Sequence, residues 1–237
     1  MSMAGDAQGA AGQTAMRSSL TSLEVARAGL AMVERDGLDG LSMRRLADDL
    51  GVQAASLYWH VQSKDHLLDL MAGELFSTLK LPAAVPVPAP GGGWRGGLRD
   101  LSAAYYRFLL SHRDAGRIVA GRVVLIGHLA RHLEPFAGLL RRGGCADTDI
   151  AYGLYAIVIY IQAFVLQQQT PLTGDSAAGA AERDALARIR EGLSHLPQDK
   201  FPVTTALAEP LTRPDIERRF FFGLDLLIDG LTRKAAG

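Results

Sequence analysis

The chain contains one cysteine, Cys145, among 237 residues. An internal disulfide is therefore impossible, and such sparing use of cysteine favours a reducing compartment, which predicts a cytoplasmic protein. A single thiol beside Gly143 and Gly144 also permits a redox-sensing interpretation, although most isolated cysteines are inert.

Neither sign of charge is in excess, because 25 Lys and Arg residues balance 25 Asp and Glu residues. Residues 17–64 are just as balanced, with six cations and six anions. Net charge therefore argues neither for nor against a nucleic-acid partner. A DNA-binding protein of this composition must place its few cations on one face and use hydroxyl, backbone and aromatic contacts to phosphate. We expect modest non-specific affinity.

Long apolar runs are also missing. The most apolar stretch, residues 151–166, is interrupted by Gln162 and followed by three glutamines. It falls short of the roughly 20 residues that a bilayer requires, so it predicts a buried helix and no membrane partner. Residues 1–19 are small and polar, which predicts a disordered tail rather than a signal peptide.

No segment alternates apolar and polar residues for long enough to predict a strand, and apolar spacings of three and four predict an all-α fold. Thr21 and Glu24 form a capping box for a helix that ends at Gly37, and Ser42 and Ser63 cap two later helices. Four prolines and five glycines in residues 81–97 predict a loop. Beyond it, helices are predicted over residues 94–110, 123–141, 150–168, 182–195 and 214–233. The helix over residues 150–168 is expected to be capped by Asp147, Thr148 or Asp149. The helix over residues 214–233 is expected to be capped by Thr212, with Pro214 in its first turn.

Residues 42–64 carry the strongest functional signal. Ala47 is small enough for two helices to cross closely, Gly51 supplies a turn, and Leu57 anchors the second helix. Small residue, glycine and apolar anchor at this spacing indicate a helix-turn-helix. The second helix also carries Ser56, Tyr58, Trp59 and His60, groups that contact DNA. An ordinary helical hairpin with a glycine turn is the alternative, but it would rarely expose that set.

Two helices are more apolar than a monomer needs. Residues 150–168 are apolar on nearly every face, and residues 214–233 repeat an apolar residue every three or four positions. Packed against their two-fold mates, they would form the four-helix bundle of a homodimer. The alternative is that both helices belong to the core of one protomer.

A second set of residues extends the helix-turn-helix signal: Gly51-Val52, Leu57 to Val61, Lys64 and Leu67-Leu68-Asp69. In these residues the chain resembles the tetracycline-repressor family of transcriptional regulators. In the core, Leu110 to Asp114 and Phe222 to Ile228 also look like the tetracycline repressors themselves. The resemblance implies a three-helix helix-turn-helix domain over residues 20–65, joined by a fourth helix to a ligand-binding and dimerisation domain over residues 66–237.

Roles in DNA binding follow from the resemblance. Arg44 matches a position that reads guanine, where a bidentate arginine is the commonest specific contact. Residues at the start of the recognition helix face base edges, and Ala54 and Ala55 replace a glutamine and a proline of the tetracycline repressors, so the operator should differ. Leu57 and Tyr58 would touch a thymine methyl group or phosphate. The expected DNA-contacting residues are Ser42, Arg44, Gln53, Ala54, Ala55, Ser56, Leu57, Tyr58, Trp59, His60 and Lys64.

The effector site departs from the family pattern. In the tetracycline repressors, a histidine, a threonine and a glutamate surround a magnesium–drug chelate. This chain has Val119, Arg122 and Gln167 at the matching positions, whereas magnesium favours oxygen ligands and carboxylate charge. We therefore expect no metal and no cofactor, and an apolar pocket in which Arg122 pairs with a ligand anion or, alternatively, lies in a salt bridge. The expected lining is Lys80, Leu101, Tyr105, Val119, Arg122, Val123, Ile157, Ile161, Gln162 and Gln167. The alternative is that these residues belong to an ordinary core.

The sequence thus predicts a homodimeric repressor that binds double-stranded operator DNA and is released by a small, largely apolar effector other than magnesium–tetracycline. An enzyme is disfavoured, because His112-Arg113-Asp114 imitates a kinase catalytic loop but Val119 stands where the asparagine is needed. A helical adaptor that has lost DNA binding is the third interpretation. Whether the ligand releases or promotes DNA binding stays open.

Overall fold

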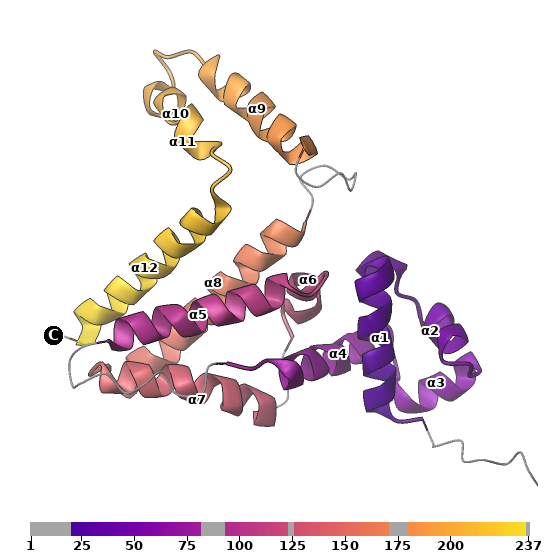
Figure 1. The fold of residues 1–237 in the computed structure, drawn as a ribbon. Helices are drawn as coiled ribbons and strands as arrows, with labels where there is room; N and C mark the ends of the chain where they lie inside the picture. The colour runs from indigo at the N-terminus through magenta and orange to yellow at the C-terminus, as the bar shows by residue number, and fades with distance from the viewer. Residues whose placement is uncertain (1–19, 82–92, 123–125, 171–179, 236–237) are drawn as a thin grey trace, which may run out of the picture.

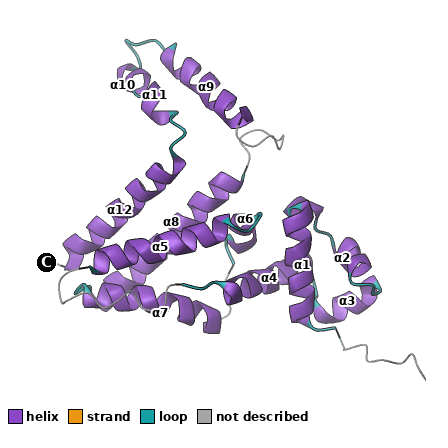
Figure 2. Ribbon diagram, viewed as in Figure 1, coloured by secondary structure: helices purple, strands orange, loops and turns teal. Residues whose placement is uncertain are grey.

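The computed structural model describes residues 20–81, 93–122, 126–170 and 180–235. In these segments the chain is helical throughout, with no strand (Figure 2). The all-α prediction is therefore confirmed. The expected disordered tail, residues 1–19, lies outside the described residues, as does Val123.

The N-terminal unit is built by helices α1 (Ser22–Asp36), α2 (Met43–Asp49), α3 (Ala54–His60) and the first half of α4 (Lys64–Thr78), with the short 3-10 turn η1 (Leu38–Gly40). The predicted caps are confirmed, because the side chains of Thr21, Ser42 and Ser63 each accept a backbone hydrogen bond from the first turn of the following helix. Arg27 on α1 pairs with the nearly buried Glu74 on α4 at 2.7 Å. The two longest helices of this unit are therefore fixed to each other.

The C-terminal unit is formed by α5 (Trp94–Leu110), α6 (Ala115–Val119), α7 (Ile126–Arg142), α8 (Asp147–Gln169) and α12 (Ile216–Ala235). Figure 1 shows α5 and α12 side by side, with α7 beneath them. Three arginines of α5 face three acids of α12, in the pairs Arg95–Asp229, Arg99–Asp225 and Arg107–Glu217. Ion pairs thus line the edge of a core that is otherwise apolar.

Helix α8 is 23 residues long, and its length and composition alone would allow it to cross a membrane. The structure nevertheless packs one of its faces against α5, α7 and α12, with Ile157, Ile161 and Val165 fully buried. The other face leaves Tyr152 and Tyr155 mostly exposed. Helix α8 is therefore a core helix with one uncovered side.

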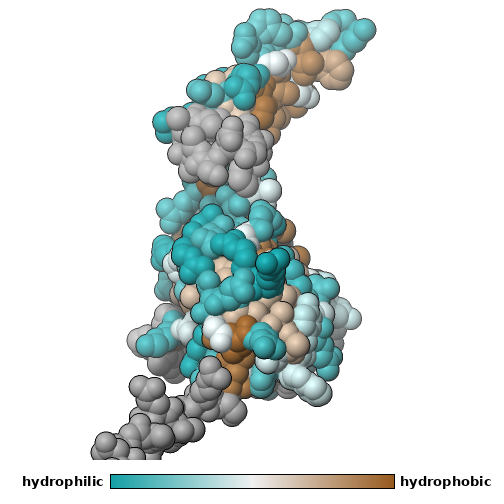
Figure 3. Space-filling view, turned by 90° about the vertical axis from the view of Figure 1, so that its right-hand side faces the viewer, coloured by the Kyte–Doolittle hydropathy of each residue, from teal (hydrophilic) through white to brown (hydrophobic). Residues whose placement is uncertain are grey.

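An arm leaves the C-terminal unit between α8 and α12. It consists of α9 (Ala180–Ser194), α10 (Pro202–Ala206) and α11 (Ala208–Leu211), which pack on one another and project away from the body (Figure 1). Seen from the side, the arm carries apolar surface along its length (Figure 3). The exposed apolar side chains there are Ile189, Phe201, Val203, Leu207 and Leu211.

Two predicted helix starts were wrong. Helix α8 begins at Asp147, so the residues expected to cap it lie in its first turn, where acids interact favourably with the helix dipole. Helix α12 begins at Ile216, because the hydroxyl of Thr212 donates to Ala208 O at 2.7 Å and so closes α11 rather than capping α12. The sequence also gave no sign of η1, α6, α10 or α11.

Gly116 on α6 tests how closely α6 and α8 approach. A Cβ atom at this position would lie 2.7 Å from Leu166 Cα and 2.8 Å from Leu166 N, and backbone atoms cannot move aside easily. We expect Gly116→Ala to destabilise the fold by about 1–3 kcal/mol, as overpacking does. Urea unfolding at a fixed protein concentration measures this.

Gly96→Ala on α5 is the matched control. A Cβ atom there would meet nothing within 4 Å, so alanine should stabilise the helix by about 0.5–1 kcal/mol. Equal midpoints for wild type and Gly116→Ala would contradict the close approach of α6 to α8.

Candidate functional site

The turn between α2 and α3 has the geometry of a glycine-closed helix end. Gly51 has a φ of 65°, Val52 N donates to Ala47 O at 3.0 Å, and Gly51 N donates to Asp48 O at 3.1 Å. These two bonds satisfy carbonyls that the end of α2 would otherwise leave unpaired. Ala47 is buried, as expected for a close helix crossing.

Helix α3 presents a short exposed face. Trp59 is 88% exposed and Tyr58 is 49% exposed, and Gln53, Ala54, Ala55 and Ser56 are exposed at its start. Because no other described element covers this face, these side chains are available to a DNA groove. Their contacts with DNA remain predictions.

Leu57 requires a correction. Its side chain has no exposed surface and belongs to the N-terminal core with Leu46 and Val61. The prediction that it anchors α3 is confirmed, and the prediction that it touches DNA does not fit a fully buried side chain. Its place on the inner face of α3 is what turns Tyr58 and Trp59 outward.

The arginines of α2 differ in what they bind. Arg45 donates to Gly40 O and to Asp36 Oδ2, both at 2.6 Å. Arg44 is exposed and forms no ion pair within the described segments. Arg44 is therefore free to reach a base, whereas Arg45 is already engaged.

The other residues predicted to contact DNA also form hydrogen bonds within the protein. Ser42 caps α2, and the backbone of His60 accepts a hydrogen bond from Ser22 Oγ at 3.1 Å. Lys64 is exposed, but its Nζ donates to Leu41 O at 2.9 Å. A phosphate contact by Lys64 would have to share or replace that bond.

Five of the predicted effector residues lie together in the C-terminal core. Leu101, Tyr105, Val119, Ile157 and Ile161 are each at most 5% exposed and belong to one apolar cluster. Gln162 joins them, because its Nε2 donates to Tyr105 Oη at 2.9 Å. Burial raises the pKa of the Tyr105 phenol, so its hydroxyl stays protonated at neutral pH.

Three other polar members of the predicted set, Arg122, Lys80 and Gln167, lie outside the apolar cluster. Arg122 is bound by α4, with its Nη1 2.7 Å from Asp69 Oδ1 and its Nη2 3.3 Å from Asp65 Oδ1. The salt-bridge alternative for Arg122 is therefore the one observed. Lys80 and Gln167 are exposed, and neither side chain lies in the apolar cluster.

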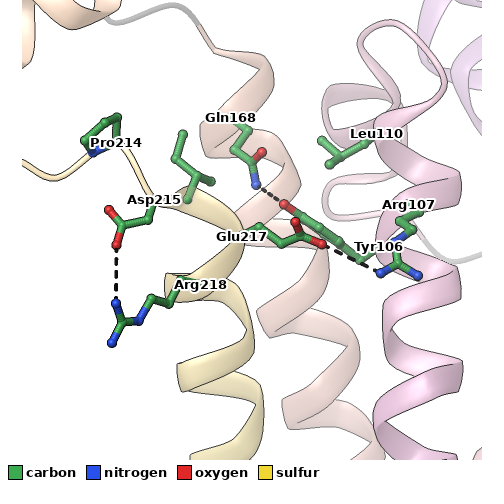
Figure 4. Close-up of a pocket in the computed structure, with 9 residues that line it drawn as sticks. Tyr106, Arg107, Leu110, Gln168, Pro214, Asp215, Glu217 and Arg218 are labelled. Atoms are coloured by element: carbon green, nitrogen blue, oxygen red, sulfur yellow. Dashed lines mark hydrogen bonds and ion pairs between the residues drawn. The ribbon is translucent and has the colours of Figure 1, made fainter.

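An open groove of about 620 Å³ lies between the end of α5, the end of α8 and the start of α12 (Figure 4). Its floor includes Tyr106, which stacks on Phe220 at 3.8 Å between ring centroids and accepts a hydrogen bond from Gln168 Nε2 at 2.8 Å. Sequence reasoning missed this groove, although three consecutive glutamines at the end of an apolar helix were a signal. Its lining is Tyr106, Arg107, Leu110, Gln168, Pro214, Asp215, Ile216, Glu217 and Arg218.

Comparison with known proteins agrees with this arrangement. Residues 25–71 match the model of bacterial regulatory proteins of the tetR family, and residues 87–235 match that of the tetracyclin repressor-like C-terminal domain. The chain belongs to the tetracycline-repressor family. Members of this family are DNA-binding regulators, so the kinase-like His112-Arg113-Asp114 run is not a catalytic loop.

Several members of the family match about nine tenths of the chain. The tetracycline repressor protein class G of Vibrio anguillarum is 30% identical over 90% of this chain and 93% of its own. Apo ActR from Streptomyces coelicolor is 32% identical, with a TM-score of 0.79 over 92% of this chain and 99% of its own. ActR in complex with actinorhodin is 33% identical, with a TM-score of 0.78 over 90% and 96%. This chain is thus a tetracycline-repressor-family transcriptional repressor with a ligand-binding domain.

Arg44 and Arg45 form a matched pair for testing the DNA-reading face. We expect Arg44→Ala to reduce affinity by roughly 1–3 kcal/mol at one base pair and to relax specificity there, as the loss of a bidentate guanine contact does. Arg45→Ala should leave base preference unchanged, because Asp36 and Gly40 hold its guanidinium. Binding to a library of single-base operator variants measures both. Equal losses on all sequences would make Arg44 a phosphate contact.

Proposed function

We propose that this regulator is a homodimeric repressor that leaves its operator when a small, largely apolar molecule binds among α5 to α8 in the cytoplasm. The observation that carries the proposal is the position of α4, which belongs to both apolar cores. Leu67 and Met71 pack in the N-terminal core, whereas Leu75 and Phe76 pack in the C-terminal one. A rearrangement of the second core therefore acts directly on the helix that supports α3.

Arg122 supplies a second part of this connection. It follows α6, which holds the predicted pocket residue Val119, and its guanidinium binds Asp65 and Asp69 in the first two turns of α4. A ligand that changes the end of α6 would weaken this clamp. The DNA-bound spacing of the two recognition helices, about 34 Å for successive major grooves, would then no longer be favoured.

The donor atoms argue against a magnesium–tetracycline chelate as the effector. Val119 offers no ligand atom, Arg122 carries a positive charge and binds α4, and Gln167 is exposed. The buried lining is instead apolar, with the Tyr105 hydroxyl and the Gln162 amide as its polar groups. Because ActR has been solved with actinorhodin, that compound is a suitable first probe.

The dimer we propose uses the uncovered sides of α8 and α12. Tyr152, Tyr155 and Ile159 form one stripe on α8, and Phe222 and Leu226 lie one turn apart on α12, each at least 45% exposed. Exposed aromatic side chains concentrated on neighbouring helices mark protein–protein interfaces. The apolar side of the α9–α11 arm continues from the same two helices, so a partner would cover it as well.

A charge in this stripe should separate the protomers. We expect Phe222→Asp, at a position 68% exposed in one protomer, to give a folded monomer at micromolar concentration with at least tenfold weaker operator binding. Phe222→Tyr keeps the aromatic surface and should remain dimeric. Sedimentation velocity with circular dichroism checks both, and a dimeric Phe222→Asp would contradict this interface.

The effector proposal is tested on an operator selected from random DNA. Ligands are first chosen by thermal shift, starting with actinorhodin and a set of apolar aromatic compounds. We expect a ligand that stabilises the protein to lower operator affinity by roughly 5- to 150-fold at saturation, the range of ordinary allosteric coupling.

Three outcomes would contradict the proposal. Unchanged affinity with verified saturation would exclude release, and increased affinity would make the ligand a co-repressor. Failure to enrich any operator would favour the adaptor interpretation.

A further inference from the structure

The N-terminal unit has a second attachment to the C-terminal unit, on the side of α1 away from α3. It is made by the turn between α5 and α6. His112 Nδ1 lies 3.1 Å from Glu34 Oε1, and Arg113 Nη1 donates to Arg35 O at 2.9 Å. Both partners belong to the last turns of α1.

Asp114 extends this attachment to η1. It has a φ of 57° and is the one non-glycine residue with positive φ in the described part of the chain. Aspartate adopts this conformation more readily than most residues, and here it directs the carboxylate at the other unit. Asp114 Oδ2 accepts a hydrogen bond from Leu38 N, the first residue of η1, at 2.8 Å.

A neighbouring ion pair reinforces the contact. Arg117 Nη2 lies 2.7 Å from Asp39 Oδ1, and this guanidinium holds the pKa of the Asp39 carboxyl below its ordinary value. The α5–α6 turn, through His112, Arg113 and Asp114, and the start of α6, through Arg117, therefore bind α1 and η1.

Gln169, the last residue of α8, forms hydrogen bonds with the backbone of this turn and of the helix ends beside it. Its Oε1 accepts from Gly116 N at 2.8 Å, and its Nε2 donates to His112 O at 2.8 Å and to Leu109 O at 3.2 Å. The amide thus uses both its oxygen and its nitrogen on the turn. Gly116 allows the turn to lie against the backbone of Leu166.

The residue next to Gln169 faces the open groove. Gln168 donates to Tyr106 Oη on the groove floor, so two consecutive side chains of α8 contact the groove and the turn (Figure 4). The last turn of α8 is therefore connected to both the surface of the effector domain and the attachment of the DNA-binding unit.

We propose that Gln169 is a positioning residue for DNA binding: by fixing the α5–α6 turn, it sets the place of α1 and η1, and hence of α2 and α3, relative to the effector domain. This route is separate from α4 and Arg122. It requires no contact between Gln169 and DNA.

The experiment uses the full-length protein and follows exchange of the Leu38 amide hydrogen, whose acceptor is Asp114. Gln169→Ala should accelerate this exchange on the order of tenfold, as expected when one or two net hydrogen bonds are lost. Amides buried in α8 should keep their wild-type rates. Gln169→Glu retains the acceptor for Gly116 but places a carboxylate oxygen against the carbonyl oxygens of His112 and Leu109, so it should accelerate the exchange at least as much as Gln169→Ala. Gln167→Ala, at an exposed position two residues away, is the matched control and should change nothing.

A double variant tests whether Gln169 affects the Leu38 amide through Asp114 or by loosening the structure as a whole. Asp114→Gly removes the carboxylate while glycine keeps the positive φ at little cost. Once the acceptor is gone, adding Gln169→Ala should not accelerate Leu38 exchange further. Multiplied effects, uniformly faster exchange in α8, or no difference between Gln169→Ala and Gln167→Ala would each overturn the proposal.

Operator affinity provides the functional readout and rests on the proposed repressor function. Gln169→Ala should weaken binding to the selected operator by about tenfold, with the dimer and its base preference unchanged. Wild-type affinity in Gln169→Ala would overturn the role in DNA binding. Because amide exchange needs no DNA, it decides the positioning role even if no operator is found.

Discussion

The short helix α6 is the constraint on which the arrangement of the two units depends. Two adjacent side chains of α6 enter different cores, Ile118 the N-terminal one and Val119 the C-terminal one. Neither core can repack without affecting the other, because close-packed interiors transmit small displacements rather than absorb them. The polar contacts of Arg122 and of the α5–α6 turn lie at the two ends of this helix, and they fix its direction.

This constraint explains how a protein with no net charge can serve as a DNA-binding regulator. Much of the charge of the N-terminal unit is used internally, since Arg35 and Arg45 pair with acids of the same unit and Arg27 pairs with Glu74 in the second half of α4. Few cations remain for phosphate, so in the dimer we propose, affinity would depend on presenting Arg44, Tyr58 and Trp59 from both protomers in the correct geometry. A weak electrostatic contribution makes such a repressor sensitive to the orientation of its recognition helices.

The local elements of the DNA-binding unit could be predicted from sequence, because their signals are local. The capping box at Thr21 and the positive φ of Gly51 each depend on neighbours a few residues away, and both are confirmed. The family resemblance led us to expect Leu101, Tyr105 and Ile157 in an apolar lining, and all three are buried. The partners of Arg122 could not be predicted, because Asp65 and Asp69 lie more than fifty residues earlier and no pattern specifies which helix meets the α6–α7 connection.

The candidate effector region shows the same limit. Periodicity identifies which positions of α5 and α8 are apolar. Both Tyr105 and Tyr106 belong to the core cluster, and the rotation of each helix against its neighbours decides that Tyr106, and not Tyr105, also lines the groove. Of the arm, only α9 was predicted. The helices α10 and α11 are only five and four residues long, too short for a periodic pattern, and α11 is closed by the hydrogen bonds of Thr212.

The most direct test of this account is the distance between the two units within one protomer. Spin labels at Ser56→Cys on α3 and Glu134→Cys on α7, with Cys145 replaced by serine and the labelled chain diluted into unlabelled protein, report that distance by pulsed electron paramagnetic resonance. If α4, α6 and the α5–α6 turn hold the DNA-binding unit as described, the free protein gives one narrow distance distribution. A broad distribution or several populations would show that the unit moves independently, and would contradict the account.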